Sequence, residues 1–343
     1  MTPEIAVNSI NWILDHVPEN TERIDFILSG GEPLLEFELI KEIFDYVRGR
    51  KISIPYIFMA STNGTILTDE MKTWFTKYRD IFRLVLCLDG NKETHNINRD
   101  NSFDKIDIDF FVRNWPNQGI KVTISEYTLG HFAENIKFLH SAGFKSIEGV
   151  NFAENGTNWD REENIKILIP QLKELADFYL SNEEYHLNQM FDRRIDCCET
   201  NSKEYKKWCN IGTGTPFFDI DGSIYPCSFV TPMSFNKDEL HNILQTDFTD
   251  DRNFTDDECI NECYIYPICP TCAAANYRMN KSFKKRNKSK CRMQKLITLH
   301  IADYQARKIR RKPIDYDKAV LYFTIEAIKK IRDLYLDDFK EYP

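Results

Sequence analysis

The uneven distribution of cysteine constrains this chain more than any other feature of its sequence. Seven of its ten cysteines lie in one block between positions 209 and 291. The members of this block are Cys209, Cys227, Cys259, Cys263, Cys269, Cys272 and Cys291. A dense block with an odd number of cysteines does not fit a framework of disulfides alone, and it is more typical of thiolates that bind metal or iron–sulfur clusters. We therefore expect a metal or cluster site in this part of the chain.

The size and charge of the chain exclude other classes of protein. Its 343 residues, 42% of them hydrophobic, are enough for about two domains or for one large barrel with an appendage. A formal net charge of −8 disfavours nucleic acid or an anionic membrane as the partner. No apolar run approaches the roughly 18 residues of a membrane span, and the N-terminus lacks the pattern of a signal peptide. We expect a cytoplasmic protein without a membrane partner.

Helix-like and strand-like segments alternate over residues 1–152. The strand-like runs begin roughly 25 to 40 residues apart, which is the spacing of βαβ units. The predicted strands are residues 24–28, 55–60, 83–88, 120–125 and 146–151, and the predicted helices are residues 3–17, 35–47, 69–77, 107–114 and 131–142. This pattern predicts an α/β fold with a parallel sheet or a partial (β/α) barrel. Such a barrel opens with a strand, whereas this chain opens with a helix, so we expect either an unusual fold or a missing first strand.

Four regions follow from the pattern along the chain. They are a partial barrel (1–187), a polar linker (188–208), a cysteine-rich domain (209–295) and C-terminal helices (296–343). An amphipathic helix is predicted over Asp160–Leu187, and we expect Pro170 to kink or reset it. Further helices are predicted over 293–311 and 316–336, and a hairpin-like turn is predicted over Asp219–Pro226.

The first predicted strand runs into the segment Gly30-Gly31-Glu32-Pro33. Ligands of parallel α/β folds bind at the carboxyl ends of the strands. Two glycines leave backbone polar groups accessible there, and Glu32 can accept a hydrogen bond from an ammonium group. A tight turn whose acid favours the dipole of the next helix explains the same four residues equally well.

Three motifs together resemble those of radical S-adenosylmethionine (SAM) enzymes. They are Gly30-Gly31-Glu32-Pro33 with Leu34-Leu35, Thr62-Asn63-Gly64, and the stretch from Asp89-Gly90 through His95 to Arg99. The resemblance implies a (β/α)6-type barrel that binds SAM through Gly30, Gly31, Glu32, Pro33, Asn63, Asp89 and Arg99. It implies that the glycines and Glu32 hold the methionine amino group, and that Asp89 and Arg99 lie near the ribose or the carboxylate.

Two positions depart from this family pattern. Cys87 stands where the family usually has serine, and Asn96 stands where it usually has aspartate. The simpler interpretation of Cys87 is a small buried strand residue, and His95 is more often structural than catalytic.

The cysteine block resembles the SPASM extension of radical SAM enzymes, which binds two auxiliary 4Fe–4S clusters. The resemblance rests on Cys209-x12-Gly222-x4-Cys227, on the four-cysteine run that begins at Cys259, and on the final Cys291. The run is spaced x3, x5, x2, where the family usually has x2, x5, x3. The resemblance implies one cluster on Cys259, Cys263, Cys269 and Cys291, and a second on Cys209, Cys227 and Cys272. Cys198 or Cys197 would supply the eighth ligand, or one iron would stay open for substrate or solvent; the alternative is zinc.

Radical SAM chemistry needs a further 4Fe–4S cluster on a C-x3-C-x2-C motif, which this sequence does not contain. We expect that a first strand and its loop are missing, either because the start was assigned to an internal methionine or because the protein is a remnant. As printed, the chain is expected not to cleave SAM. It would bind SAM and the third cluster only with the missing segment present.

The resemblance implies an enzyme that modifies a peptide or protein. We expect a maturase that forms thioether or carbon–carbon crosslinks in a ribosomal peptide. An anaerobic sulfatase maturase is the alternative enzyme, although that type has aspartate after the hairpin cysteine, where this chain has Ser228. A non-catalytic iron–sulfur or zinc remnant that binds peptides is the remaining alternative.

The expected partners are a peptide or protein substrate, with or without a leader, and an electron donor such as a flavodoxin or ferredoxin. The basic run Lys281–Lys295 is either solvated surface or a docking face for an acidic peptide. Glu126, Tyr127 and Glu154 are candidates to face the substrate, and no catalytic residue is assigned.

Overall fold

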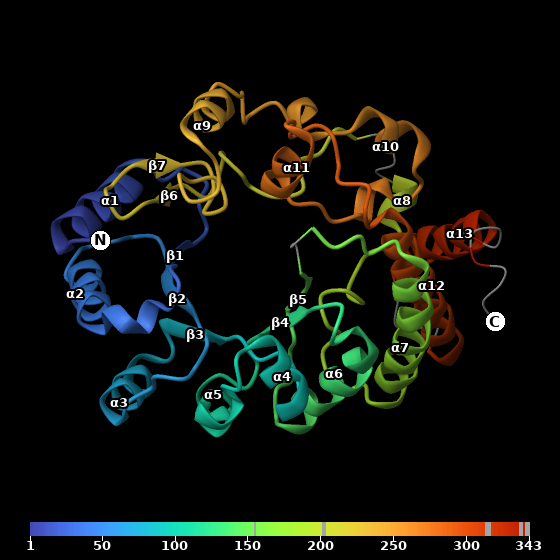
Figure 1. The fold of residues 1–343 in the computed structure, drawn as a ribbon, viewed down its shortest axis with the longest axis horizontal. Coiled ribbons are helices and arrows are strands. Elements are labelled where there is room, and N and C mark those ends of the chain that lie inside the picture. Colours follow the sequence, from blue (N-terminus) through green and yellow to red (C-terminus); the bar gives the residue numbers. More distant parts are fainter. Residues whose placement is uncertain (154–155, 201–203, 313–316, 336–338, 340–343) are drawn as a thin grey trace. The chain divides into compact units, whose positions relative to one another are not determined.

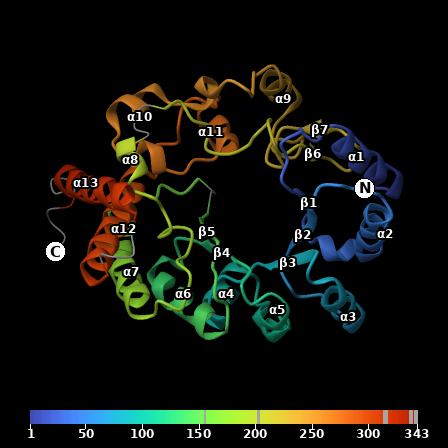
Figure 2. The same cartoon turned by 180° about the vertical axis from the view of Figure 1, so that it is seen from behind.

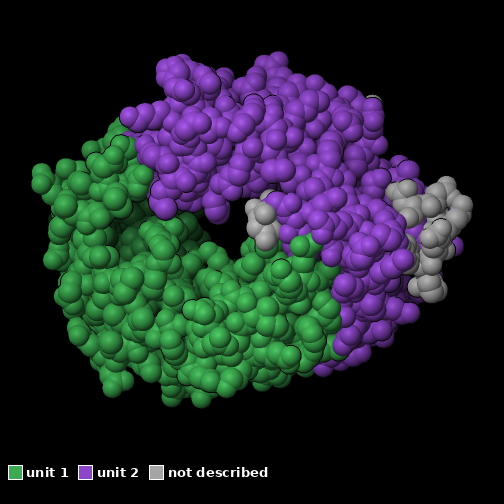
Figure 3. All heavy atoms as spheres, viewed as in Figure 1, with its two compact units in different colours: residues 1–153, 184–189, 218–223 green, residues 154–183, 190–217, 224–343 purple. Residues whose placement is uncertain are grey.

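The computed structural model describes the chain in two compact units. It describes residues 1–343 except 154–155, 201–203, 313–316, 336–338 and 340–343. The first unit comprises residues 1–153, 184–189 and 218–223, and the second comprises the remaining residues (Figure 3). The four regions expected from the sequence, with boundaries at 187, 208 and 295, stay a prediction.

Five parallel strands form the framework of the first unit (Figure 1). The three-stranded sheet has the order β1-β2-β3, and β4 pairs with β5. Their bounds are β1 Ile24–Leu28, β2 Tyr56–Thr62, β3 Phe82–Leu86, β4 Lys121–Ile124 and β5 Gly149–Phe152. A parallel bridge between Cys87 and Lys121 joins the two sheets, so the residue that follows β3 lies beside the first residue of β4. The α/β fold with a partial barrel is confirmed.

Helices cover one face of these strands, as both views show for α2, α3, α5 and α6 (Figures 1 and 2). The helices are α1 Pro3–Asp15, α2 Phe37–Arg48, α3 Asp69–Tyr78, α4 Lys92–Asn98, α5 Ile108–Asn114 and α6 Phe132–Ser141, with short turns η1 Pro33–Glu36, η2 Phe103–Lys105 and η3 Leu129–His131. Thr2 and Thr68 cap the first turns of α1 and α3 through their hydroxyl groups. Helix α4 is not predicted by the sequence pattern, although Asn91 caps it by accepting from the Thr94 N–H.

Alternation along the strands directs one set of side chains into the core under the helices. Phe26 and Phe58 are buried, whereas Ile27, which follows Phe26 in β1, is 58% exposed. The ring of Phe58 stacks on Phe26 at 5.0 Å between centroids and on Phe82 at 5.6 Å, and Phe44 from α2 meets its edge at 5.3 Å. This aromatic cluster fixes α2 against the sheet.

Long helices organise the second unit. Helix α12 (Cys291–Arg311) packs against both α7 (Glu162–Ser181) and α13 (Lys318–Tyr335). Pro170 lies inside α7 without ending it, and the helix stops at Ser181 rather than at residue 187 as predicted. The shorter elements of the second unit are α8 Cys197–Thr200, β7 Ile224–Tyr225, α9 Lys237–Leu244, η4 Asp251–Phe254, α10 Asp257–Glu262, η5 Tyr266–Ile268 and α11 Ala273–Asn280, and strand β6 (Phe217–Phe218) spans the boundary between the two units.

The hairpin β6–β7 confirms the predicted turn. The Asp219 N–H donates to the Ser223 carbonyl at 2.9 Å, and Gly222 adopts the positive φ of +86° that the turn needs. Across the part of the chain that the structure describes, no helix combines the length and the apolar character needed to cross a membrane.

Replacing Phe58 by alanine should lower the free energy of unfolding by about 3–5 kcal/mol, because a fully buried ring is lost from the aromatic cluster. Chemical denaturation measures this difference. Leu35, which is 72% exposed, provides the control, and Leu35→Ala should change the free energy of unfolding by no more than about 0.5 kcal/mol. Equal losses in the two variants would contradict the assignment of the core.

Candidate cofactor and cluster sites

Glu32 joins the glycine segment after β1 to the turn after β2. Its Oε1 accepts from the Leu34 N–H at 3.1 Å and from the Thr62 hydroxyl at 2.9 Å, and its Oε2 accepts from the Asn63 N–H at 2.8 Å. Two of the three sequence motifs therefore meet at one carboxylate. A carboxylate offers about four acceptor positions, so one position of Glu32 remains for a donor from outside these contacts.

The two glycines before Glu32 leave open space beside the backbone. A Cβ atom on Gly30 or Gly31 would meet no atom within 4 Å, and neither residue has a positive φ. The packing of the chain itself therefore does not require glycine at these positions. A ligand that approaches the main chain closely fits this space, and SAM is such a ligand.

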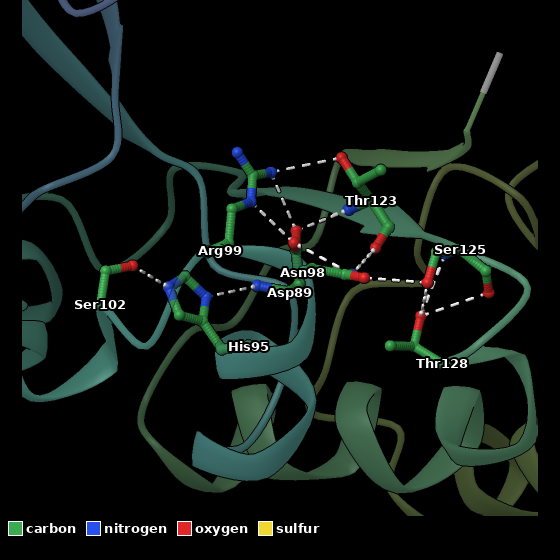
Figure 4. Close-up of polar contacts among 8 residues, drawn as sticks. All are labelled: Asp89, His95, Asn98, Arg99, Ser102, Thr123, Ser125 and Thr128. Atoms are coloured by element: carbon green, nitrogen blue, oxygen red, sulfur yellow. Dashed lines mark hydrogen bonds and ion pairs between the residues drawn. The ribbon is translucent and has the colours of Figure 1, made fainter. Parts of the chain in front are cut away.

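The buried carboxylate of Asp89 is the centre of a network at the strand ends (Figure 4). Its side chain is 0% exposed and forms an ion pair with Arg99, with N–O distances of 2.8 and 3.1 Å. The Thr123 N–H donates to Oδ1 at 2.8 Å, and the Asn98 amide donates to Oδ2 at 3.2 Å. About four acceptor positions are thus all occupied. Asp89 therefore positions Asn98, Arg99 and Thr123, and a contact of Asp89 with SAM stays a prediction.

Arg99 can present a cation to a ligand from this network. Its Nη2 also donates to the Thr123 hydroxyl at 3.3 Å. The hydrogen bond with Asp89 raises the pKa of Arg99 above its ordinary value, so the side chain stays charged. Its third nitrogen carries no contact among the residues drawn in Figure 4, and its side chain is 30% exposed. A guanidinium held in this way can bind a carboxylate with little loss of side-chain entropy.

His95 supports the network in its neutral form. It is buried, its Nδ1 accepts from the Asp89 N–H at 3.3 Å, and its Nε2 lies 3.1 Å from the Ser102 hydroxyl. Burial lowers the pKa of His95, and the nearby charge of Asp89 only partly offsets this effect. The geometry assigns His95 a structural role, as the sequence analysis expected.

Acid should destabilise the protein partly through His95. Since its folded pKa lies below the ordinary value of about 6.5, the stability present above about pH 6.5 is lost as the pH falls through the folded pKa. Chemical denaturation at about pH 7.5 and about pH 5.5 should show this loss. His95→Asn keeps an acceptor without titrating, so its loss should be smaller. Burial also lowers the pKa of His140 and His300, and these two residues destabilise the wild type and the variant equally in acid. Any difference between the two proteins therefore reports on His95, and an equal loss of stability would contradict its role.

Cys87 lies among the charged groups of the strand-end site. Burial raises the pKa of its thiol, the charges of Arg99 and Lys121 lower it, and those of Asp89 and Glu32 raise it. The thiol is only partly buried. The expected small buried residue is therefore found at the edge of the site rather than in the core.

Four of the cysteines assigned to one cluster lie within electrostatic reach of one another. Cys259 and Cys263 pack into one small apolar cluster. Burial is the main cause of the raised pKa of Cys263, Cys269 and Cys291, and it raises that of Cys291 to about 12. The charge of Cys269 raises the pKa of Cys263 and Cys291, and that of Cys259 raises the pKa of Cys269 and Cys291. We call these four residues the first cysteine group.

Asp160 fixes the last member of this group. Its carboxylate accepts from the Arg292 N–H at 2.9 Å and from the Met293 N–H at 2.8 Å, in the first turn of α12. Cys291 is the first residue of that helix. The cap therefore fixes the Cys291 thiol at a helix N-terminus, where burial and the charge of Asp160 raise the pKa of the thiol.

Two guanidinium groups face the first cysteine group without a carboxylate partner among the described residues. Arg286 is 6% exposed, its Nη1 donates to the Cys269 carbonyl at 3.2 Å, and its buried Nε has no partner. Burial lowers the pKa of Arg193 to about 10, while the charge of Cys269 raises it. Buried cations without a counter-ion are costly. Four thiolates with a 4Fe–4S cluster form a net anion that would neutralise them, so these residues fit such a group.

The cysteines assigned to the other cluster border a second core. Cys227 and Cys272 both pack against one apolar cluster that includes Ile211. The Gly212 N–H donates to the Pro226 carbonyl at 3.0 Å, which holds the segment after the exposed Cys209 beside Cys227. We call Cys209, Cys227 and Cys272 the second cysteine group, and their convergence on one cluster stays a prediction.

Cys198 lies beside the first cysteine group. Burial raises the pKa of its thiol, and the charges of Cys197 and Cys263 raise it further. Its helix α8 contacts η5, the turn between Cys263 and Cys269. As the eighth cluster ligand, Cys198 stays a prediction.

Within the described residues, no three His, Cys, Asp or Glu side chains are close enough to hold a single metal ion. Cysteines of a 4Fe–4S cluster bind different iron atoms, so they need not converge on one point as the ligands of zinc do.

Acidic partners accompany the basic run Lys281–Lys295. Its ion pairs include Lys281 with Glu239, Lys284 with Asp257, Lys288 with Glu258 and Arg292 with Glu162. This pairing favours the solvated surface over the docking face that the sequence analysis also considered. Of the substrate-facing candidates, Tyr127 is 84% exposed, Glu126 has a partner, and Glu154 lies outside the described residues.

Several residues of these sites escaped sequence reasoning. Thr123 and Asn98 complete the Asp89 network, Asp160 caps α12, and Arg286 faces the thiols. Asp160 and Arg292 are 132 positions apart. No local signal marks such contacts, because only the folded chain brings the partners together.

Comparisons with known proteins agree with this geometry. No family model matches the chain. Over 247 residues it is 25% identical to the cysteine-type anaerobic sulfatase-maturating enzyme of Clostridium perfringens, and the match covers 67% of this chain and 65% of that protein. It is 24% identical over 238 residues to an uncharacterized protein of Methanocaldococcus jannaschii, covering 67% of this chain and 76% of that protein.

Solved structures share the fold. The enzyme anSMEcpe with bound AdoMet superposes with a TM-score of 0.66 and 19% identity, over 91% of this chain and 90% of that one. The same enzyme with AdoMet and the Cp18Cys peptide gives a TM-score of 0.64 at 19% identity, over 91% of each chain. The fold is therefore that of a radical SAM enzyme. In sequence the chain is similar to the anaerobic sulfatase-maturating enzyme of Clostridium perfringens, and this match spans somewhat less than two thirds of that relative's length.

Proposed function

We propose that this chain is the SAM-binding and cluster-binding part of a radical SAM maturase that modifies a peptide or protein. The observation that carries the proposal is the Glu32 carboxylate, which binds Thr62 and Asn63 and so joins two motifs that the resemblance assigns to one ligand. The homology with sulfatase-maturating enzymes supports the same interpretation.

Different residues of the first unit would bind different parts of SAM. Glu32 offers its remaining acceptor position to the methionine ammonium group, and Gly30 and Gly31 give the ligand room beside the backbone. Arg99, oriented by the saturated Asp89, binds the carboxylate. When bound to a reduced 4Fe–4S cluster, SAM supplies a radical that removes a hydrogen atom from the substrate.

The cysteine groups of the second unit would hold two auxiliary 4Fe–4S clusters. The first group supplies four thiolates, and the second supplies Cys209, Cys227 and Cys272 with one position left for solvent or substrate. Cys198 remains the alternative eighth ligand, although its contacts place it beside the first group. An electron donor such as a flavodoxin or ferredoxin would reduce the clusters. Zinc is the competing occupant of both groups.

The comparisons favour a sulfatase-maturase type of reaction over the peptide crosslinking that the sequence analysis placed first. The fold is also shared with anSMEcpe in complex with AdoMet and the Cp18Cys peptide, which supports a peptide substrate here. Ser228 stands where that type of enzyme has an aspartate, which is its proposed base. Another residue of this chain would therefore have to accept the proton that the substrate loses.

Anaerobic purification and reconstitution should give about eight irons per chain with matching sulfide, because two clusters bind four irons each. Replacing Cys209, Cys227 and Cys272 by serine should leave about four irons, bound by the first group. Replacing the four cysteines of the first group should instead leave about four irons, bound by the second group. Cys87→Ser, outside both groups, is the matched control and should change nothing. About one or two zinc ions with little iron would overturn the cluster assignment.

Glu32→Gln should weaken SAM binding by roughly tenfold to a hundredfold, because one charge-assisted hydrogen bond to the ammonium group is lost. The measurement is equilibrium binding on the reconstituted chain with any residues encoded ahead of Met1 restored. Glu36→Gln, an exposed acid of the same turn, should bind SAM normally. Equal binding by both variants would contradict the role of Glu32.

The substrate class is tested on the same restored chain with a cysteine-containing sulfatase peptide, SAM and a reductant. Loss of the cysteine sulfur, measured by mass spectrometry, supports the sulfatase-maturase type. Loss of hydrogen with the sulfur retained indicates crosslinking instead, and an unchanged peptide with SAM intact indicates a non-catalytic remnant.

A further inference from the structure

Three cations from two segments of the second unit lie near the first cysteine group. Lys288 places its ammonium nitrogen 3.3 Å from the Cys259 sulfur. Arg286 lies near enough for its charge to act on Cys259, Cys263 and Cys269 together. The charge of Arg193 acts on Cys269.

Each of the two nearest cations is held in place by contacts away from the sulfur atoms. The Arg286 guanidinium lies over the Tyr266 ring, 4.7 Å from its centroid, and donates to the Cys269 carbonyl. Lys288 forms an ion pair with Glu258 at 3.1 Å and lies 3.9 Å from buried Asp256. These contacts fix the positive charges beside the thiols without giving Arg286 a carboxylate partner among the described residues.

Fixed charge beside a cluster changes its reduction potential. Reduction adds one negative charge, so a nearby cation or a hydrogen bond to a ligand sulfur stabilises the reduced state more than the oxidised state. The effect is strongest where the cation is buried and water cannot screen it. Arg286 meets this condition at 6% exposure, and Lys288 adds a direct hydrogen bond to sulfur.

We propose that Lys288 and Arg286 set the reduction potential of the cluster held by Cys259, Cys263, Cys269 and Cys291, and keep it above the value that the four thiolates alone would give. This inference rests on the proposed function, because it requires an iron–sulfur cluster in the first cysteine group. The two residues act as positioning charges and do not ligate iron.

The test is a redox titration of the reconstituted chain followed by electron paramagnetic resonance. The signal that Cys291→Ser removes is assigned to the first group. In Lys288→Met this signal should titrate at a lower potential with unchanged iron content. Lys288→Arg keeps the cation and should titrate close to the wild-type potential. Arg286→Met should also lower the potential. Lys288 is partly exposed (43% of its side chain), so its variants keep the test decisive if Arg286→Met fails to fold.

Lys284→Met is the matched control, because Lys284 belongs to the same basic run but pairs with Asp257 at 2.8 Å and contacts no thiol among the described residues. It should leave the potential unchanged. An unshifted potential in Lys288→Met, or an equal shift in Lys284→Met, overturns the inference while the iron content still supports the cluster. A wild-type chain that binds no iron in the first group overturns the proposed cluster and this inference together.

Discussion

The buried ion pair of Asp89 and Arg99 is the interaction on which the strand-end site depends. A carboxylate with no exposed surface is tolerable only when its acceptor positions are filled, and here Asn98 of α4, Arg99 and the Thr123 backbone of β4 fill them. The same contacts tie the end of β3 to β4 and orient Arg99. Stability and ligand geometry therefore have one origin: removing Arg99 would leave the buried Asp89 carboxylate without its cation, and removing Asp89 would release the Arg99 guanidinium.

In the cysteine region, by contrast, buried cations lack a carboxylate partner within the described residues. Arg286 keeps a buried Nε without a partner, and its cation and that of Arg193 lie beside thiols whose pKa burial raises. Such a site is poorly satisfied by the chain itself. It becomes balanced when the thiols are deprotonated and bind a cluster, so folding and cluster binding should support each other. In the first unit Asp89 balances the charge of Arg99, whereas in the second unit Arg286 has no carboxylate partner among the described residues.

Local signals predicted most of the elements and failed where contacts are distant. Strand β1 lies where its apolar run before Ser29 predicts it, and the spacing of the strands predicts the parallel fold. Helix α4 was missed because its polar residues carry no apolar stripe, and the end of α7 was placed too late. The cysteine block identified the candidate cluster region, but no sequence pattern indicated the contact of Lys288 with Cys259 or of Asp160 with α12.

The sequence by itself determined the residue types: glycines and an acid after a strand, an Asp–Arg stretch, and seven cysteines at family-like spacing. Tertiary structure alone decided their roles. It showed that Asp89 is saturated and so orients Arg99, that Glu32 joins two motifs, and that cations without a carboxylate partner among the described residues face the first cysteine group. The physical reason is that hydrogen-bond capacity and desolvation depend on every neighbour of a group, and those neighbours can lie as far as 132 positions away in the chain.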